Sequence, residues 1–486
     1  MNVFATNVHR KTDQMTIEDF ARTTTTHRSP AHALRGLCGG AVHLPGDPGY
    51  DSARLAWNLA VDQRPAAVAI PADAGQAAQV VRVAAAAGLR VAPQSTGHNA
   101  GPLGRLDDVV IVRTSAMDSV QIDPDRHRAR VGGGALWQSA VQAAAGHGFA
   151  TLHGSSPDVG IAGYSLGGGI GWYARALGLA TNSVTGLEVV TAAGEVVWAD
   201  AEHHPELFWA LRGGSGNFGI VTALEFRIFP FTSAFAGMLV WDAALAEPVL
   251  RRWLQWAGDA PDEVTTSFRI LRLPPLTDIP APFRGRHLVI IDGAVLASDE
   301  RGAEILAPLR DLQPEVDTFA RTPVQALTGL HMDPEGPSPG VSNTVVVDAM
   351  PEAAIHAFLD RARAGSSVLL HELRQLGGAL GRPADGAGAM PTLPGAFLAF
   401  AGAIAATPEM AAAGLRDTAE FAAALAPFGS RRNYLNFQEN PVDPATGFDP
   451  VTFGRLVTLK SALDPDGVLV GNHLVRRTYE MEDEFF

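Results

Sequence analysis

The chain has little cysteine and no long apolar run, and each absence narrows what the protein can be. Cys38 is the single cysteine in 486 residues, which excludes a disulfide within the chain and a cysteine-rich metal site. No run of eighteen apolar residues occurs, so we expect no membrane span. Residues 1–30 are polar and rich in threonine, which predicts a flexible tail and not a signal peptide. We therefore expect a cytoplasmic protein.

Positive charge is also scarce. The chain has 37 Lys and Arg residues against 51 Asp and Glu, a formal net charge of −14. Nucleic-acid binding needs a concentrated basic surface, so we expect no nucleic-acid partner. The length exceeds that at which single hydrophobic cores stop growing, which predicts at least two domains.

The first half of the chain and its middle differ in pattern. Residues 67–70, 75–87 and 89–92 predict a βαβ unit, and residues 187–198 predict a hairpin. From about residue 232 to 425, strand-like segments such as 288–291 and 344–347 alternate with amphipathic helices at 352–363 and 408–424. This is an α+β pattern, unlike the first half.

The sequence GYSLG around Ser165 fits the G-x-S-x-G nucleophile elbow of a serine hydrolase, and Asp464 and His473 follow in the required order. The elbow needs a buried strand before it, and Pro157 and Gly160 interrupt the only available segment. The three glycines after the motif also begin a helix poorly. A serine hydrolase using Ser165 is therefore the alternative hypothesis.

Two further patterns are weak. Gly169 begins a G-x-G-x-x-A match for a dinucleotide site, with Glu188 about twenty residues on, but the same strand is missing. The pair His203 and His204 follows the hairpin without matching ligands, so we expect a surface loop and no metal site.

Several separated segments favour a different function. They are PQSTGHNAG at 93–101, IAGYSLGGG at 161–169, GLATN at 178–182, ELFWALRGGSGNFGIVT at 206–222, and YLNF at 434–437. In this order they resemble the FAD-linked oxidases of the vanillyl-alcohol-oxidase type, and within them the berberine-bridge-enzyme-like group. The resemblance spans roughly residues 50 to 475.

The resemblance implies an α+β fold with a PCMH-type FAD-binding domain and a substrate domain whose antiparallel sheet is covered by helices. It places the FAD-binding domain at 31–231, with its PCMH-type core at about 62–231, and the substrate domain at 232–425. Residues 426–486 would return to the FAD domain. The partners would be a small-molecule substrate and molecular oxygen, and the chain would be a monomer or homodimer.

The resemblance also implies the cofactor contacts, with FAD bound covalently through the imidazole of His98. The further expected contacts are Gln94, Ser95, Thr96, Gly97, Asn99, Ser156, Val159, Gly160, Gly163, Gly167, Gly168, Gly169, Gly171, Ile220, Val221, Asn436 and Asn472. Glycines and small residues there would let backbone N–H groups approach a pyrophosphate.

Two positions bear on the number of covalent flavin links and on the reaction with oxygen. Many relatives carry a cysteine where this chain has Ser156, and that cysteine forms a second flavin link. A hydroxyl lacks the nucleophilicity of a thiolate, so we predict a single link through His98. Val159 stands at the family's oxygen gatekeeper position, where valine goes with oxidase activity.

The resemblance implies Tyr434 as the base that takes the substrate proton, although a free tyrosine has a pKa near 10. Glu372 is the alternative base. Alternation along a strand at 371–376 would put Glu372 and Arg374 on one face and His371 and Leu373 on the other. Either face could meet the flavin. The expected reaction is hydride transfer from a C–H next to a hydroxyl or amine to flavin N5, with oxygen reduced to hydrogen peroxide.

Overall fold

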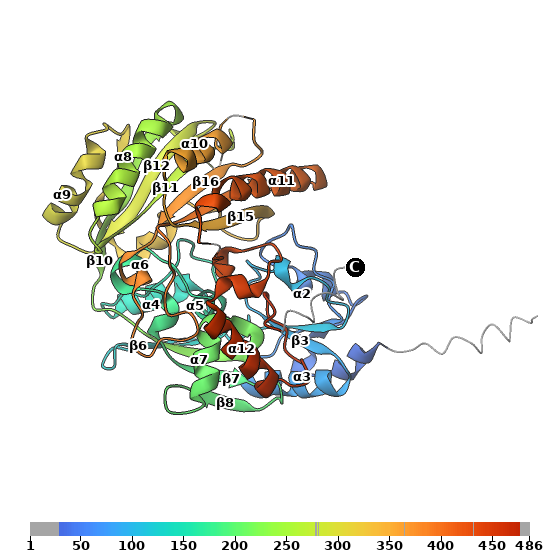
Figure 1. The fold of residues 1–486 in the computed structure, drawn as a ribbon. Coiled ribbons are helices and arrows are strands. Elements are labelled where there is room, and N and C mark those ends of the chain that lie inside the picture. Colours follow the sequence, from blue (N-terminus) through green and yellow to red (C-terminus); the bar gives the residue numbers. More distant parts are fainter. Residues whose placement is uncertain (1–28, 278, 280, 364, 431, 477–486) are drawn as a thin grey trace, which may run out of the picture.

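Three β-sheets organise the chain, in a computed structural model that describes residues 29–277, 279, 281–363, 365–430 and 432–476. Figure 1 shows two of the sheets in the lower part of the molecule and the largest in the upper part. The predicted tail lies almost wholly outside the described residues. None of the described helices is both long and apolar enough to cross a membrane.

The first sheet contains the predicted βαβ unit. Its order is β1 (Val42–His43), β2 (Ala67–Ala69), β4 (Val109–Arg113), β3 (Arg90–Gln94), and both β2 and β3 run parallel to β4. Helix α2 (Tyr50–Arg54) precedes β2, and α3 (Ala74–Ala86) connects β2 to β3. Asp73 caps α3 by accepting from the Gln76 amide, and Gly88, with φ +72°, follows its end. The prediction for this unit is confirmed.

The second sheet is antiparallel. Its order is β5 (Val120–Asp123), β6 (Arg128–Gly132), β9 (Ile220–Arg227), β7 (Val184–Val190), β8 (Val196–Ala199). The strands β7 and β8 form the predicted hairpin. The helices that accompany this sheet are α4 (Trp137–Gly146), α5 (Ile161–Leu166), α6 (Ala174–Leu177) and α7 (Pro205–Gly214).

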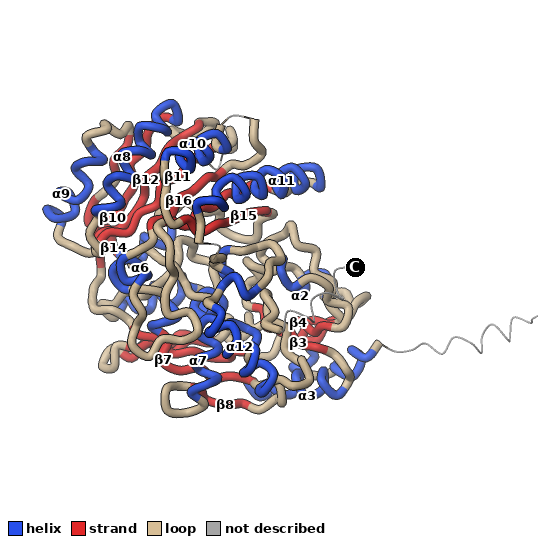
Figure 2. The backbone as a smooth tube through the Cα atoms, in the orientation of Figure 1, coloured by secondary structure: helices blue, strands red, loops and turns tan. Residues whose placement is uncertain are grey.

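The third sheet is antiparallel and covered by helices on one face, as predicted. Its order is β13 (Val316–Asp317), β10 (Ser233–Asp242), β12 (His287–Val295), β11 (Val264–Arg272), β16 (Leu370–Gln375), β17 (Phe397–Ile404), β15 (Gly340–Val347), and β14 (Ala320–Pro323) also pairs with β10. Figure 2 shows its strands beneath the helices α8 (Ala246–Asp259), α9 (Asp299–Arg310), α10 (Glu352–Arg361) and α11 (Pro408–Leu425). An apolar core that includes Trp253, Phe358 and Phe421 joins these helices to the sheet.

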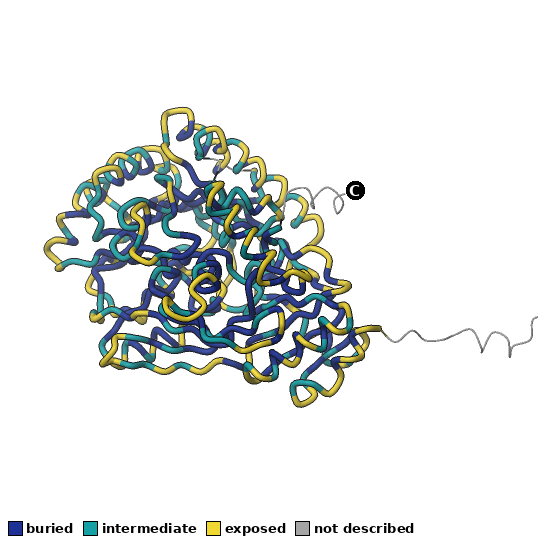
Figure 3. Tube along the Cα trace, turned by 60° about the horizontal axis from the view of Figure 1, so that its bottom comes forward, coloured by how far each residue is buried: buried dark blue, intermediate teal, exposed yellow. Residues whose placement is uncertain are grey.

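The end of the chain returns to the first half. Helix α12 (Pro450–Leu463) contacts α7, and Leu469 forms a parallel bridge with Val91 of β3. Lys460 holds the C-terminal segment against the first half. Its ammonium donates to the carbonyls of Asn217 and Leu469 and pairs with Asp464 at 2.6 Å. The limits 31–231, 232–425 and 426–486 remain our proposed domains. Figure 3 shows that buried residues gather in the interior of the molecule and exposed residues along its outside.

Candidate active site

A cavity of about 480 Å³ lies between the uncovered face of the third sheet and the loops of the first half. Its walls come from the end of β3, from α5, from the loop after α7, and from β16 and β17. Segment 435–439 and residues 471–473 close another side. The predicted contacts that line it are Gln94, Ser95, Thr96, Gly97, His98, Asn99, Ser156, Val159, Gly160, Gly163, Gly167, Val221, Asn436 and Asn472, together with Glu372.

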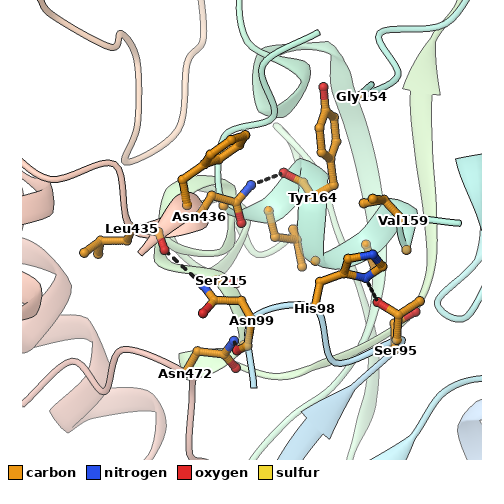
Figure 4. A pocket seen from close by; sticks show the side chains of 18 of the residues that line it. Ser95, His98, Asn99, Gly154, Val159, Tyr164, Ser215, Leu435, Asn436 and Asn472 are labelled. Carbon is orange, nitrogen blue, oxygen red and sulfur yellow. Dashed lines mark hydrogen bonds between the residues drawn. The ribbon is translucent and has the colours of Figure 1, made fainter. Parts of the chain in front are cut away.

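The loop after β3 turns sharply to present His98. Gly97 has φ +85°, and a Cβ there would collide with the Gln94 side chain, so only glycine fits. The His98 ring stacks on Trp57, with centroids 4.0 Å apart and 16° between the planes. Its Nδ1 lies 2.7 Å from Thr96 Oγ1. Figure 4 shows the His98 ring among the side chains that line the cavity. The imidazole is therefore held in one orientation.

Asp158 lies beside this imidazole. Its Oδ1 is 3.7 Å from His98 Nε2 and accepts a 2.8 Å hydrogen bond from Ser156 Oγ. Its Oδ2 accepts from Trp57 Nε1 at 2.5 Å and from the Gly336 amide at 3.0 Å. Burial opposes the charge, but these hydrogen bonds hold the pKa of Asp158 well below its ordinary value. Ser156, at the expected cysteine position, is thus a donor to this carboxylate.

The cavity wall carries buried polar atoms that no protein group satisfies. Ser95 Oγ, His98 Nε2 and Asn99 Oδ1 are buried without a hydrogen-bond partner. Gly163 adds space, because a Cβ there would meet nothing within 4 Å and would stand in the cavity. Unsatisfied buried polar atoms of this kind call for a polar ligand. The residues present therefore fit FAD.

Asparagines tie the C-terminal segment to this site. Asn99 Nδ2 donates to the Leu435 carbonyl at 3.1 Å, and Asn436 Nδ2 donates to the Tyr164 carbonyl at 3.0 Å (Figure 4). Asn472 donates to the Asn99 carbonyl. These contacts bring together three segments that are far apart in sequence.

The structure does not support the alternative hypothesis of a serine hydrolase using Ser165. No strand precedes Ser165, which lies inside α5 and is only 2% exposed. Asp464 pairs with Lys460, and His473 Nε2 lies 3.0 Å from the Gln438 carbonyl, so neither is engaged with Ser165. The dinucleotide pattern fails similarly, because Glu188 belongs to β7 and contacts Arg130.

Some expected cofactor contacts lie behind the wall. Gly168 and Gly169 have φ +119° and +80°, and a Cβ on Gly169 would stand 2.5 Å from the Tyr164 ring. A Cβ on Gly171 would collide with the His153 carbonyl, and Ile220 is fully buried in the core of the first sheet. None of these four lines the cavity. Their positions are explained by packing.

Tyr434, the expected base, is not among the residues that line the cavity. It is fully buried, and its hydroxyl accepts the Gly169 amide at 2.8 Å. Burial raises the pKa of Tyr434 to about 12, although hydrogen bonds from Asn436 and Gly169 oppose this. Phe437 lines the cavity instead, and its phenyl ring cannot accept a proton.

The sheet presents Glu372 and Arg374 to the cavity, while His371 and Leu373 face the helices. Glu372 is 2% exposed and lies 2.9 Å from Arg374 Nε. Burial opposes its ionisation, yet Arg374 and His331 hold the pKa of Glu372 well below its ordinary value. This carboxylate is therefore a poor base.

His331 belongs to the same charged wall and is not in any sequence motif. Its Nδ1 lies 2.8 Å from Asp292, which also pairs with Arg269. Burial and Arg269 oppose protonation, but Asp292, Asp333 and Glu372 raise the pKa of His331 to about 9. We therefore expect a cationic imidazole at neutral pH.

For His203 and His204 the sequence predicted a surface loop and no metal site. His203 Nδ1 lies 3.0 Å from Asp200 on an exposed turn. Among the described residues, no group of three or more His, Cys, Asp or Glu side chains could hold a metal ion.

Comparisons with known proteins agree with this site. An FAD binding domain model matches residues 65–200. The (R)-6-hydroxynicotine oxidase of Paenarthrobacter nicotinovorans is 36% identical over 209 residues, which cover 43% of this chain and 46% of that protein. The match thus spans less than half of that relative.

Two solved structures share the fold. 6-Hydroxy-D-nicotine oxidase from Arthrobacter nicotinovorans has a TM-score of 0.76 at 26% identity, covering 88% of this chain and 95% of that chain. Glucooligosaccharide oxidase from Acremonium strictum, described with a 6-S-cysteinyl, 8α-N1-histidyl FAD, has a TM-score of 0.76 at 22% identity, covering 92% and 99%. Residues 65–200 thus match an FAD binding domain, and the chain is similar to FAD-linked oxidases such as 6-hydroxy-D-nicotine oxidase, whose fold it shares.

Proposed function

We propose that this chain is an FAD-dependent oxidase acting on a small organic substrate with a C–H bond next to a hydroxyl or amine. The observation that carries the proposal is the cavity between the two halves, where His98 and unsatisfied polar atoms face the charged wall of the third sheet. The names of the relatives, which include a hydroxynicotine oxidase and a glucooligosaccharide oxidase, agree with amine or alcohol oxidation.

The residues of the first half would hold the cofactor. Bound FAD would supply the hydride acceptor and pass the electrons to molecular oxygen. His98 would carry the single covalent link, in the orientation fixed by Trp57 and Thr96. Ser95 and Asn99 would offer their unsatisfied polar atoms to it.

Ser156 supports the single link. Its Oγ donates to Asp158 and is therefore engaged with a carboxylate beside His98. A serine hydroxyl also lacks the thiolate chemistry that a second link requires. Val159 lines the same cavity and would leave oxygen access to the flavin.

The third sheet would bind the substrate. Glu372, Arg374 and His331 form a buried charged surface on the cavity side. Leu370, Phe400 and Phe437 add apolar surface beside it. This mixture suits a small substrate that has both polar and apolar parts.

The purified protein tests the proposal directly. We expect a flavin absorption spectrum, yellow colour that stays with acid-precipitated protein, and hydrogen peroxide on aerobic turnover. (R)-6-hydroxynicotine and xylobiose serve as amine and alcohol probes. A colourless protein that does not take up FAD would reject the proposal, and colour released by acid would reject the covalent link.

A further inference from the structure

The two ring nitrogens of His98 have different neighbours. Nδ1 lies 2.7 Å from the Thr96 hydroxyl, a group that either donates or accepts. Nε2 is buried without a hydrogen-bond partner among the described residues, and Asp158 Oδ1 lies 3.7 Å from it. That separation is longer than a hydrogen bond but within the range of an ion pair. The imidazole therefore has a hydroxyl on one side and a carboxylate on the other.

Asp158 is held by donors from three separate segments. Its Oδ2 accepts from Trp57 Nε1 at 2.5 Å and from the Gly336 amide at 3.0 Å, and its Oδ1 accepts from Ser156 Oγ at 2.8 Å. Burial opposes the charge, yet these bonds hold the pKa of Asp158 well below its ordinary value. A carboxylate oxygen has two lone-pair sites, so Oδ1 keeps one for a further donor.

An ionised carboxylate only accepts hydrogen bonds, and this selects the tautomer of the neighbouring imidazole. A lone pair on His98 Nε2 would face the negative charge of Asp158, whereas an Nε2–H proton is attracted by that charge. In the neutral ring the proton therefore lies on Nε2, and Nδ1 keeps its lone pair. The Thr96 hydroxyl then donates to Nδ1 and frees it by rotating away.

Trp57 ties this pair to the backbone. Its indole donates to Asp158 and stacks on the imidazole of His98. The Trp57 amide donates to the Thr96 carbonyl at 2.8 Å, and the Trp57 carbonyl accepts from the Ser338 amide at 3.1 Å. Ser338, like Gly336, lies just before β15 of the third sheet. The alignment of carboxylate and imidazole therefore depends on the contact between the two halves of the chain.

From these contacts we propose that Asp158 is a positioning residue for the covalent attachment of FAD. It holds the Nε2 proton of His98, so that Nδ1 offers its lone pair to the 8α-methyl carbon of the flavin. A nucleophile oriented by a neighbouring group in this way is the usual arrangement in covalent chemistry. The proposal rests on the proposed function, which gives His98 the covalent link.

The attachment step balances as follows from the groups present. A bond forms between His98 Nδ1 and the methyl carbon, and one C–H bond of the methyl group breaks. Two electrons pass into the flavin, and molecular oxygen takes them up with two protons to give hydrogen peroxide. One proton comes from the methyl group and the other from Nε2. As Nδ1 bonds to carbon the ring becomes an imidazolium, and the Asp158 carboxylate stabilises this charge until the Nε2 proton leaves to solvent.

A purely structural role for Asp158 makes a different prediction. If the carboxylate served only to anchor Trp57 and the Gly336 amide, a neutral amide of the same shape would serve as well. An asparagine oxygen can accept both of those hydrogen bonds, but its NH₂ group cannot hold the Nε2 proton of His98. Asp158→Asn therefore separates anchoring from the effect of the charge.

The test follows attachment over time in full-length chains made by cell-free synthesis and then given FAD. The visible spectrum measures total bound flavin, and the colour and mass that stay with acid-precipitated protein measure attached flavin. We expect Asp158→Asn to bind FAD but to attach it roughly 100-fold more slowly than the wild type. Asp107→Asn, which breaks an exposed pair with Arg105, is the matched control and should attach FAD at the wild-type rate.

A second variant supplies the carboxylate from solution. The Asp158 side chain is 20% exposed, so a small anion can reach the space that Asp158→Ala leaves. Sodium formate should restore part of the attachment in Asp158→Ala, and sodium chloride at the same concentration should not. Proton NMR of the flavin peptide from the wild type should show the bond at Nδ1.

The remaining outcomes separate this proposal from the proposed function. Attachment at the wild-type rate in Asp158→Asn, or a wild-type bond at Nε2, overturns the role of Asp158 and leaves the oxidase function intact. If Asp158→Asn binds no FAD, Asp158→Ala decides, and failure of formate to restore attachment overturns the proposal. If the wild type releases all its flavin in acid, the covalent link and this proposal both fail, while hydrogen peroxide formation still tests the oxidase function.

Discussion

The imidazole of His98 stacks on the indole of Trp57, with ring centroids 4.0 Å apart. The same indole donates to Asp158, which also faces His98 Nε2. Trp57 therefore positions both groups at once, although it lies about forty residues before the histidine and outside every motif.

We predict that His98→Ala retains the fold and binds FAD without a covalent bond. Removing the imidazole leaves the glycine-rich wall intact but takes away the only expected attachment point. Acid precipitation should release the yellow colour from His98→Ala and not from wild type. Ser156→Ala is the matched control and should keep its colour. Colour lost from Ser156→Ala would show that the serine takes part in attachment.

Val159→Leu should slow reoxidation of the reduced flavin by oxygen more than its reduction by substrate. The larger side chain would reduce the space at the cavity wall where Val159 lies. We expect roughly a tenfold or larger fall in the oxygen step, equivalent to about 1.4 kcal/mol in the barrier. Stopped-flow spectroscopy of both half-reactions measures this. Equal slowing of both would contradict the gatekeeper role.

Tyr434→Phe should affect stability more than chemistry. The change leaves the buried Gly169 amide without its acceptor, which costs about 1–3 kcal/mol. Denaturant unfolding should show this loss, while flavin reduction stays within a few-fold of wild type. Tyr173→Phe removes a buried hydroxyl that has no partner among the described residues, so it should be nearly neutral. A collapse of flavin reduction in a stable Tyr434→Phe would restore Tyr434 as the base.

Gly163→Leu should block the cofactor without harming the fold. The residue is helical and its missing Cβ would point into the cavity, so leucine gains up to about 1 kcal/mol of helix propensity while filling cofactor space. The ratio of flavin to protein absorbance should fall sharply. Gly258→Leu, at an exposed position of α8 with the same open surroundings, should leave that ratio unchanged. Full flavin content in Gly163→Leu would show that FAD does not pass this residue.

Glu372→Gln should destabilise the protein at neutral pH by about 3–5 kcal/mol, because Arg374 loses its buried partner. The folded-state pKa of Glu372 lies below its ordinary value of 4.5, so its contribution is present above that pH and is lost as pH falls. The difference between wild type and variant in unfolding free energy should therefore shrink in acid. Glu420→Gln, which breaks an exposed pair with Arg361, should cost at most about 1 kcal/mol. A pH-independent difference would contradict this explanation.

Much of the site could be predicted because its signals are local. A loop of small residues directly after β3 placed His98 near Gln94 and Asn99, and alternation along β16 separated Glu372 and Arg374 from His371. Which face met the cavity could not be predicted, since both faces carry polar side chains. The helices α10 and α11 decide this, because they cover the face with His371.

The YLNF segment shows that a motif does not predict which of its side chains lines the cavity. The sequence placed an aromatic residue near the site, but a short 3-10 turn at Leu435–Phe437 decides which ring lines the cavity. That turn buries Tyr434 against Gly169 and turns Phe437 toward the cavity. Gly168 and Gly169 belong to the same packing, since their positive φ angles let the backbone lie against Tyr434 and Tyr164.

The sequence by itself determined the βαβ unit, the α+β pattern of the middle segment, and the glycine-rich loops that can approach a ligand. These follow from periodicity, turn residues and side-chain size over short stretches. Only the tertiary structure decided the chemistry of the wall. Trp57, His331 and Glu439 come from distant segments. The pKa values of His331 and Glu439 depend on burial and on neighbours that only the folded chain brings together.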